Sequence, residues 1–282
     1  MTLVLVATPL GNMADLSPRA IDILGSADTV ACEDTRRTGQ LLHLAGIQAR
    51  RLVAVHEHNE ASMVPSILAQ LERGETVALV SDAGLPGISD PGERLVRAAA
   101  EAGLAVSVVP GPSAAVAALV ISGLPTGRWV FEGFLPRKGS ERTARLQAVS
   151  SEARTVVLYE APHRLRTTLR ALGDACGGER RVVLVRELTK LHEEVWRGTL
   201  AEAMALEAEP RGEYVVVLDG APPPEPVTDA DIEVAFAARL AADGDRRTAV
   251  SGTALDLGVP KRRVYEAAVR MRASGHVPHR YG

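Results

Sequence analysis

The sequence predicts two α/β domains followed by a small helical segment. Apolar runs rich in β-branched residues alternate with helical patterns up to residue 220, which is typical of a parallel or mostly parallel sheet with helices on both faces. Residues 221–228 contain four prolines and are expected to form a semi-rigid linker, because proline fits neither a helix interior nor a ladder strand. The composition, 46% hydrophobic and 24% charged in 282 residues, suits a soluble globular protein with more than one core.

The first domain is expected to span residues 1–124. Ser17 before Pro18 is a good helix N-cap followed by proline at the first helical position, and Asp90 before Pro91 repeats that signal. In order, we expect a strand at 3–7, a helix at 18–24, a strand at 29–32, a helix at 35–44, a strand at 52–55, a helix at 60–73, a strand at 76–80, a helix at 91–102, a strand at 105–109 and a helix at 113–121.

The second domain is expected to span residues 125–220 and to repeat the alternation. Its length lies within the usual range for a domain. In order, we expect a strand at 130–134, a helix at 141–149, a strand at 155–159, a helix at 163–175 and strands at 181–186 and 214–219.

The C-terminal helical domain, residues 229–282, contains a helix, a turn at Gly258 and a second helix that begins at Lys261, Arg262 and Arg263. This spacing resembles a helix-turn-helix, whose second helix could enter a major groove. A compact helical cap with a solvated basic edge would show the same spacing. The three cations would suit the phosphates of RNA as well as those of DNA.

The net charge and the cysteine content limit which functions and compartments are plausible. The net charge is −3, so contact with a nucleic acid has to come from a local basic patch. Cys32 and Cys176 lie far apart and in no metal-ligand spacing, which favours a reducing compartment and argues against structural zinc. We therefore expect a cytoplasmic protein. No apolar run approaches the roughly 18 residues of a membrane span, and no signal peptide is expected.

The segment from residue 80 to residue 92 is the most informative stretch. It leaves an apolar strand and enters a helix through two carboxylates, Asp82 and Asp90, and three glycines. Glycine lets the backbone lie against a ligand, and carboxylates accept hydrogen bonds from hydroxyls or amines. The segment is therefore expected to line a binding site, although an ordinary turn, with Asp90 as a helix cap, would use similar residues.

Several common catalytic signatures are missing from the sequence. No glycine-rich G-x-G-x-x-G joins a strand to a helix, and no phosphate-binding G-x-x-x-x-G-K-[ST] occurs, which disfavours Rossmann dinucleotide binding and ATP hydrolysis. No G-x-S-x-G or H-E-x-x-H occurs either. His56 and His58 are too close in sequence to share a helix face, and no metal site is predicted.

Three loops follow predicted strands, at residues 8–12, 82–90 and 110–114. In an open α/β sheet, ligands bind beyond the carboxyl ends of the strands. We therefore expect these loops to converge on one pocket.

These loops are part of a longer series of motifs. The series is Ala7-Thr8-Pro9-Leu10-Gly11-Asn12, Glu33-Asp34-Thr35-Arg36, Ser81-Asp82-Ala83-Gly84, Ile88-Ser89-Asp90-Pro91-Gly92, Pro110-Gly111-Pro112-Ser113-Ala114, Glu132-Gly133-Phe134-Leu135-Pro136, Tyr159-Glu160-Ala161-Pro162-His163-Arg164 and Arg186-Glu187-Leu188-Thr189-Lys190. Together these motifs resemble the ribosomal RNA small subunit methyltransferase I family, within the tetrapyrrole methylase superfamily. The resemblance covers about residues 2–220 and the tail more loosely.

The resemblance implies a homodimer with S-adenosylmethionine in a cleft between the two α/β domains. The implied reaction is transfer of its methyl group to the ribose 2′-oxygen of a cytidine in the 16S rRNA of the 30S subunit. The implied cofactor-binding residues are Leu10, Asp82, Gly84, Ile88, Ser89, Asp90, Ser113, Ala114, Tyr159 and Tyr214.

The same resemblance suggests candidates for the reaction. Asp34, His58 and Glu160 are candidate base or orienting groups, and Arg36 is a candidate for holding an RNA phosphate. Asp34 would equally serve as the cap of the helix that follows it. We expect alignment of the reactants to matter more than any single base, because positioning can supply roughly 7–11 kcal/mol whereas a general base typically gives about 10²–10⁴-fold.

RNA contacts are expected on basic segments. The loop after Pro136 carries three cations, and a solvated loop would look the same. With few aromatic residues in the chain, we expect recognition by shape rather than by stacking on aromatic platforms. The candidates are Arg137, Lys138, Arg142, Arg164, Lys190, Lys261, Arg262 and Arg263.

Two other functions fit parts of the sequence. One is a different methylase of the same superfamily, acting on a corrin precursor or on the modified histidine of the diphthamide pathway. The other is a transcriptional regulator that binds nucleic acid through the tail and a small effector through the first domain. The motifs that begin at Glu33 and at Tyr159 favour the rRNA methyltransferase.

Overall fold

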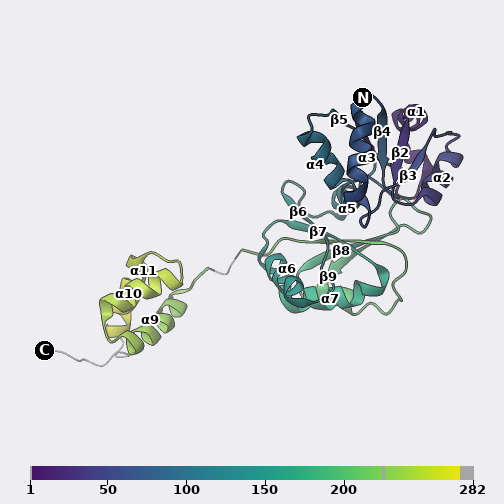
Figure 1. Ribbon diagram of the computed structural model, residues 1–282. Coiled ribbons are helices and arrows are strands. Elements are labelled where there is room, and N and C mark those ends of the chain that lie inside the picture. The colour runs from purple at the N-terminus through teal and green to yellow at the C-terminus, as the bar shows by residue number, and fades with distance from the viewer. Residues whose placement is uncertain (1, 224–225, 274–282) are drawn as a thin grey trace. The chain divides into compact units, whose positions relative to one another are not determined.

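The computed structural model describes residues 2–223 and 226–273 (Figure 1). The chain divides into two compact units, residues 1–221 and residues 222–282. Among these described residues, the first unit contains two sheets and the second contains three helices. Within the part of the chain that the structure describes, every helix is too short or too polar to cross a bilayer.

The first sheet is parallel throughout, with strand order β3-β2-β4-β1-β5. Helices α1 and α2 cover one face and α3 and α4 cover the other, as predicted for alternating strands and helices. The bounds are β1 Thr2–Val6, α1 Pro18–Ser26, β2 Thr29–Cys32, α2 Thr35–Leu44, β3 Leu52–Ala54, α3 Glu60–Glu72, β4 Thr76–Val80, α4 Glu93–Glu101 and β5 Val106–Val109, with a short 3-10 helix η1 at Met13–Asp15.

The carboxyl ends of these parallel strands lie at one edge, where three loops meet. Thr8 after β1 and Gly84 after β4 exchange backbone hydrogen bonds of 2.9 and 3.1 Å. The Ala7 amide donates to the Val109 carbonyl at 3.2 Å, and a Cβ built on Gly111 would lie 2.9 Å from the Cβ of Ala7. The predicted convergence of the three loops is therefore confirmed.

The second sheet is mixed, with strand order β6-β7-β10-β8-β9, and only the pair β6 and β7 runs parallel. Helices α6, α7 and α8 pack on one face. The other face is covered by α5. The bounds are α5 Ala114–Ser122, β6 Trp129–Phe134, α6 Gly139–Ser151, β7 Thr155–Glu160, α7 Pro162–Cys176, β8 Arg181–Arg186, β9 Glu194–Thr199, α8 Leu200–Met204 and β10 Tyr214–Leu218.

This sheet is not the parallel or mostly parallel sheet expected from the alternation, because β8 and β9 form an antiparallel hairpin and β10 pairs antiparallel with both β7 and β8. Two further features of this second half differ from the expectation. β9 and α8 were not predicted, because β9 is an edge strand whose residues are all exposed or only partly buried and α8 has only five residues. The helix expected at 113–121 forms as α5, but its buried residues, such as Ala118 and Leu119, pack against strands of the second sheet. The domain boundary at residue 124 stays a prediction, and α5 joins the two halves structurally.

The second unit consists of α9 Asp229–Asp243, α10 Arg246–Asp256 and α11 Lys261–Ala273 around one apolar core. Thr228 and Asp231 form a capping box at the start of α9, and Asp245 caps α10. Gly258 adopts φ +63° between α10 and α11. The predicted helix, glycine turn and basic second helix are confirmed, while residues 274–282 of the expected tail lie outside the described residues.

Candidate active site

A cavity of about 440 Å³ lies in the first unit and is lined by loops from both sheets. Nine of the ten predicted cofactor-binding residues line it, together with one candidate for the reaction, Glu160, and one predicted RNA-binding residue, Lys190. Residues predicted only as part of longer motifs, or not singled out at all, complete the wall. The lining is Leu10, Ala83, Gly84, Leu85, Ile88, Ser89, Asp90, Ser113, Ala114, Phe134, Tyr159, Glu160, Ala161, Pro162, His163, Val185, Leu188, Lys190, Glu213, Tyr214 and Val215.

In the wall from the first sheet, the loop backbones approach one another closely at Gly84. Gly84 has φ +81°, and a Cβ on it would lie 3.1 Å from Leu10 Cδ2 and 3.4 Å from the Pro112 carbonyl oxygen. The close approach of these loops therefore requires glycine at this position. Ser113 is the N-cap residue of α5, but its side chain makes no capping hydrogen bond. Its hydroxyl thus remains available to a ligand in the cavity.

Asp90 is the carboxylate that this wall contributes to the cavity. The helix after it begins at Glu93 with Gly92 as N-cap, so Asp90 is not the cap of that helix. Burial, reinforced by the negative charge of Glu33, raises the pKa of Asp90 to about 6. A carboxyl group whose ionisation is costly because it is buried gains most from a cationic ligand.

Asp82, the remaining predicted cofactor-binding residue, does not line the cavity. Its carboxylate accepts a hydrogen bond from the Asp34 amide at 3.3 Å and pairs with Arg37 at 3.2 Å. It therefore ties the loop after β4 to the start of α2. Burial and the charge of Asp82 together raise the pKa of the neighbouring Glu33.

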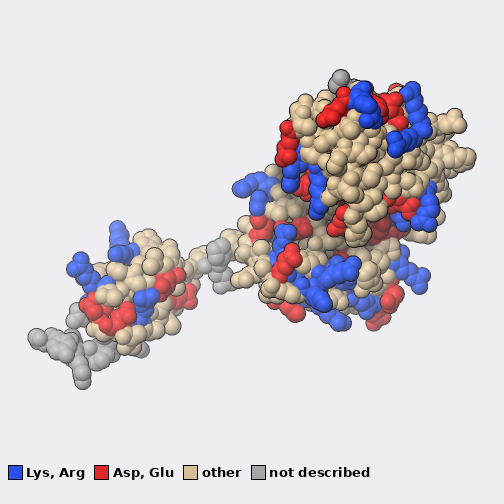
Figure 2. Space-filling model, viewed as in Figure 1, with Lys and Arg blue, Asp and Glu red and all other residues tan. Residues whose placement is uncertain are grey.

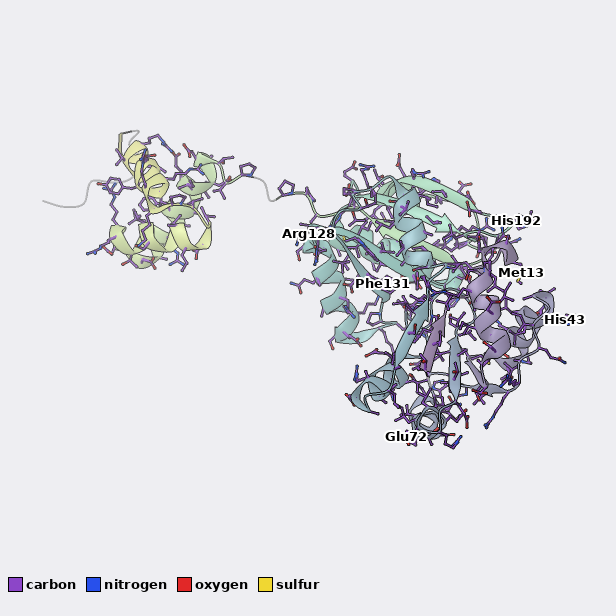
Figure 3. All side chains as sticks on the ribbon, turned by 90° about the horizontal axis from the view of Figure 1, so that it is seen from above. Met13, His43, Glu72, Arg128, Phe131 and His192 are labelled. Atoms are coloured by element: carbon purple, nitrogen blue, oxygen red, sulfur yellow. The ribbon has the colours of Figure 1, made fainter. Side chains whose placement is uncertain are left out.

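The wall from the second sheet is aromatic. Tyr159 of β7 accepts a hydrogen bond from the Ala115 amide at 3.1 Å, which connects the sheet to the start of α5. Burial raises the pKa of Tyr159. Phe131 and Phe134 both pack against Tyr159 with tilted rings, at centroid distances of 4.9 and 5.7 Å. Phe131, labelled in Figure 3, is partly buried.

A bulge in β6 creates this aromatic cluster. Residues three apart on a regular strand point to opposite faces, yet Phe131 pairs with Val157 and Phe134 with Tyr159, which share a face. The register shifts between Phe131 and Gly133, and Gly133 adopts φ +59°. The extra residue therefore turns Phe134 toward the cavity. A Cβ on Gly133 would lie 3.1 Å from Ser89 Oγ, so the bulge also touches the opposite wall.

Glu160 is only 2% exposed and is fully engaged. It accepts hydrogen bonds from the Thr168 hydroxyl at 2.6 Å and the Ala161 amide at 2.9 Å, and it pairs with Arg164 at 3.3 Å. Arg164 in turn donates to the Leu135 carbonyl at 2.6 Å. This network fixes the chain that follows Phe134.

Arg142 belongs to the same network. It donates to the Pro136 carbonyl at 2.8 Å and to the Thr168 hydroxyl at 3.3 Å. Two of the predicted RNA-binding arginines, Arg142 and Arg164, therefore hold the backbone of the segment after β6. Both guanidinium groups are committed to bonds inside the protein.

Lys190 closes the cavity from the loop after β8. Its ammonium group pairs with Glu187 at 3.0 Å and Glu213 at 2.8 Å. Its side-chain stem lies directly over Gly11, where even a Cβ would collide with it. Figure 3 shows Met13 and His192, from these two loops, at the same side of the molecule. The Lys190 ammonium group therefore connects segments of the protein through ion pairs and is not a free cation.

The other candidates for the reaction lie outside the cavity lining. Asp34 caps α2 by accepting from the Arg36 amide at 2.8 Å, and it pairs with the Arg36 side chain at 3.0 Å. This partner lowers the pKa of Asp34 to about 2. His58 is exposed, with its ring 6.1 Å from that of His56. In the described residues, no group of three or more His, Cys, Asp or Glu could hold a metal ion.

Some of the remaining predicted RNA-binding residues form ion pairs within the protein and others do not. Arg137 and Lys138 are exposed, and the described residues offer them no ion pair. In the second unit Lys261 is exposed, whereas Arg262 pairs with Glu266 at 2.8 Å and Arg263 with Asp229 at 2.9 Å. Figure 2 shows basic and acidic side chains interspersed over the visible face of the first unit.

Sequence reasoning did not assign roles to several lining residues. Three of them, Phe134, Leu188 and His163, belong to the motifs that carry the family resemblance. The residue types of a motif do not tell which of its side chains faces the cavity. Glu213 was missed because it lies outside every motif. Its position next to Tyr214 is the signal that could have found it.

The chain matches the family of Tetrapyrrole (Corrin/Porphyrin) Methylases over residues 2–204. Solved structures agree on the fold. Uroporphyrin-III C-methyl transferase from Thermus thermophilus, complexed with S-adenyl homocysteine, is 19% identical with a TM-score of 0.55 and covers 77% of this chain and 96% of its own. Diphthine synthase is 15% identical with a TM-score of 0.58 and covers 78% and 90%. The chain therefore belongs to the tetrapyrrole methylase family.

Curated relatives assign the chain to a narrower family. Ribosomal RNA small subunit methyltransferase I of Synechocystis sp. is 43% identical over 277 residues, which cover 97% of this chain and 99% of the relative. The protein of that name from Escherichia coli O157:H7 is 42% identical and covers 96% and 95%. Within the tetrapyrrole methylases, the chain belongs to the ribosomal RNA small subunit methyltransferase I family. The resemblance and the fold class predicted from the sequence are confirmed.

Proposed function

We propose that the chain uses S-adenosylmethionine to methylate the ribose 2′-oxygen of a cytidine in the 16S rRNA of the small ribosomal subunit. The observation that carries the proposal is the cavity, formed by the predicted cofactor loops, in a chain that matches rRNA methyltransferases along almost its whole length. Bound there, the cofactor supplies an electrophilic methyl group.

The cavity residues suit that cofactor. Its ammonium and sulfonium groups are cationic, and Asp90 is a carboxylate in the lining. Leu10, Ile88 and Leu188 provide apolar surface for the uncharged parts. A cavity of about 440 Å³ falls within the usual size of small-molecule sites. Polar groups placed in a mostly apolar pocket are the arrangement expected for a cofactor of this kind.

Alignment is the main task we assign to the chain. Glu160 already accepts three partners, so we assign it to fixing the second wall rather than to removing the hydroxyl proton. Asp34, Arg36 and His58 lie outside the lining, so a role for them requires that the RNA extend over the edge of the first sheet. Holding the reacting atoms in line can supply roughly 7–11 kcal/mol, which exceeds the usual gain from a general base.

RNA binding is proposed for the cations that keep free donors. Arg137 and Lys138 lie close in sequence to the cavity residue Phe134, and Lys261 begins α11 of the second unit. Deleting the chain after Pro226 is expected to weaken binding to the 30S subunit and to leave the cofactor dissociation constant within about twofold, since the two units have separate cores. Loss of cofactor binding in this truncated protein would contradict that division of labour.

We also propose a cytoplasmic homodimer. Both cysteines are free thiols, which suits a reducing compartment. The edge strand β5 and helix α5 leave valines exposed, with Val108 at 44%, Val116 at 47% and Val120 at 66%, and exposed apolar surface of this kind often marks an interface. Val120→Lys is expected to shift the mass measured by light scattering from dimer to monomer, and an unchanged mass would exclude this surface.

The decisive experiment incubates the protein with methyl-labelled S-adenosylmethionine and one of three acceptors. These are 30S subunits lacking the modification, protein-free 16S rRNA and duplex DNA. Label in the ribose of a 30S cytidine is expected. Absence of transfer, combined with tight sequence-selective binding to the duplex, would favour a regulator that uses α10 and α11 instead.

A further inference from the structure

We propose that Phe134 is a stacking platform for the nucleobase of the nucleotide that is methylated. The proposal rests on the function proposed above and adds a base-binding subsite to it. Phe134 lines the cavity but is 50% exposed, whereas its partner Tyr159 is largely covered. An aromatic ring that is half free at the opening of a cavity has surface left for a planar ligand.

Two features of the fold hold the Phe134 ring in this exposed position. The β6 bulge, with Gly133 at φ +59°, turns Phe134 to the same face as Tyr159. Without the extra residue, the alternation of the strand would direct the ring away from the cavity. The ring then rests against Tyr159 at a centroid distance of 5.7 Å and an interplanar angle of 63°. An exposed apolar side chain is therefore held in place rather than left loose.

The segment after Phe134 is also fixed. Arg164 donates to the Leu135 carbonyl and Arg142 to the Pro136 carbonyl, at 2.6 and 2.8 Å. Arg164 pairs directly with the buried Glu160, and Arg142 is linked to it through the Thr168 hydroxyl. A platform anchored in this way loses little conformational entropy when a base stacks on it.

The neighbouring charges favour a nucleotide over an uncharged aromatic ligand. Arg137 and Lys138 follow Phe134 by three and four residues, and both are exposed without an ion pair in the described part of the chain. Exposed His163 adds a further polar group to the cavity lining. An aromatic ring beside free cations is the combination with which proteins bind single-stranded nucleic acid.

The cavity is large enough for the cofactor but not for the cofactor and the target base together. A volume of about 440 Å³ is near the lower end for sites that hold one small molecule. With the cofactor inside, the acceptor nucleoside has to approach from the opening, where Phe134 is exposed. A target base drawn out of the RNA would stack there, while its ribose reaches toward the methyl group.

The test combines a change in the enzyme with a change in the substrate. Phe134→Leu removes the aromatic face and keeps apolar bulk, and Phe134→Trp keeps an aromatic face. The substrates are reconstituted 30S subunits whose 16S rRNA carries either the normal target nucleotide or an abasic one with its 2′-hydroxyl intact. Transfer of labelled methyl gives kcat/KM, and calorimetry gives the dissociation constant of the cofactor.

With the normal nucleotide, Phe134→Leu is expected to lower kcat/KM about tenfold, as for loss of one base stack, while Phe134→Trp stays within about threefold. Removing the base should cost the wild-type enzyme about tenfold and cost Phe134→Leu almost nothing, because the two changes remove the same contact. Equal losses in both enzymes would overturn the proposal. So would a tenfold weaker cofactor dissociation constant in Phe134→Leu, which would place the ring against the cofactor.

The flanking cations are tested separately. Arg137→Ala with Lys138→Ala is expected to weaken 30S binding about tenfold and to flatten its dependence on salt. The control, Arg51→Ala, removes an exposed arginine just before β3, at the amino edge of the first sheet, and should leave binding unchanged. Equal effects of the two changes would contradict the subsite. If the wild-type enzyme transfers no methyl group to 30S subunits at all, the proposed function fails rather than the stacking inference.

Discussion

The two walls of the cavity are built in different ways. The first sheet contributes loops that follow parallel strands, and its part of the lining combines closely approaching backbone, Asp90 and apolar side chains such as Leu10 and Ile88. The second sheet contributes Tyr159, Phe134 and a buried ionic network around Glu160. The first wall follows from topology, because parallel strands end at one edge. The second wall depends on a bulge and on side-chain contacts that have to be individually correct.

This contrast predicts that stability is most sensitive to the second wall. Glu160→Ala removes a buried carboxylate and leaves the partly buried Arg164 and the buried Thr168 hydroxyl without it, which should lower the free energy of unfolding by about 3–5 kcal/mol. Urea unfolding followed by tryptophan fluorescence measures the loss. Arg50→Ala, which breaks an exposed pair with Asp28, should cost at most about 1 kcal/mol. Comparable losses in the two variants would mean that the network contributes no more than a surface ion pair.

The bulge glycine should couple the two walls. Gly133→Ala forces a non-glycine residue into a left-handed conformation, which costs about 1–2 kcal/mol, and places a methyl group 3.1 Å from Ser89 Oγ. We expect a lower melting temperature together with weaker cofactor binding by calorimetry.

Two other glycines separate these effects. Gly139 has φ +87° with nothing within 4 Å of a built Cβ, and Gly127 has open space and no positive φ. Gly139→Ala should therefore lower the melting temperature without changing cofactor affinity, and Gly127→Ala should change neither. If Gly139→Ala weakened the cofactor as much as Gly133→Ala, contact with Ser89 would not be the cause.

The carboxylate of the first wall makes cofactor binding depend on pH. The pKa of Asp90 is about 6, raised by burial and by the charges of Glu33, Asp82 and Glu213. A cationic ligand favours the ionised form, so its affinity should be constant well above pH 6 and fall below it, by at most about tenfold per pH unit. Calorimetry between pH 5 and 8 measures this, roughly spanning the pKa.

Two substitutions test whether Asp90 is the group whose titration makes cofactor binding depend on pH. Asp90→Asn should bind the cofactor about tenfold more weakly at neutral pH, through loss of one charge contact, and should show a flat profile. Glu33→Gln removes a neighbouring negative charge, so the inflection should move to lower pH. An inflection near pH 6 that persists in Asp90→Asn would assign the titration to another residue.

The sequence carried enough information for the first wall but not for the second. Hydrophobic alternation predicted the strands of the parallel sheet, and strand-end motifs then predicted that residues such as Leu10, Gly84 and Ser113 meet. The exposure of Phe134 depends on a one-residue shift in pairing, which residue patterns do not encode. The commitment of Arg142 and Arg164 to backbone carbonyls depends on long-range contacts, so basic side chains in a motif were overestimated as RNA ligands.

Asp82 gives the sharpest test of what the motif series can predict. Sequence reasoning placed it beside Asp90 as a cofactor ligand, but its carboxylate bonds the Asp34 amide and Arg37 outside the lining. Asp82→Asn should therefore change the cofactor dissociation constant by only about threefold, as for a partly exposed ion pair. Arg37→Ala should have the same small effect and should add nothing in the double variant. A tenfold loss in Asp82→Asn, matching Asp90→Asn, would restore Asp82 to the cofactor site.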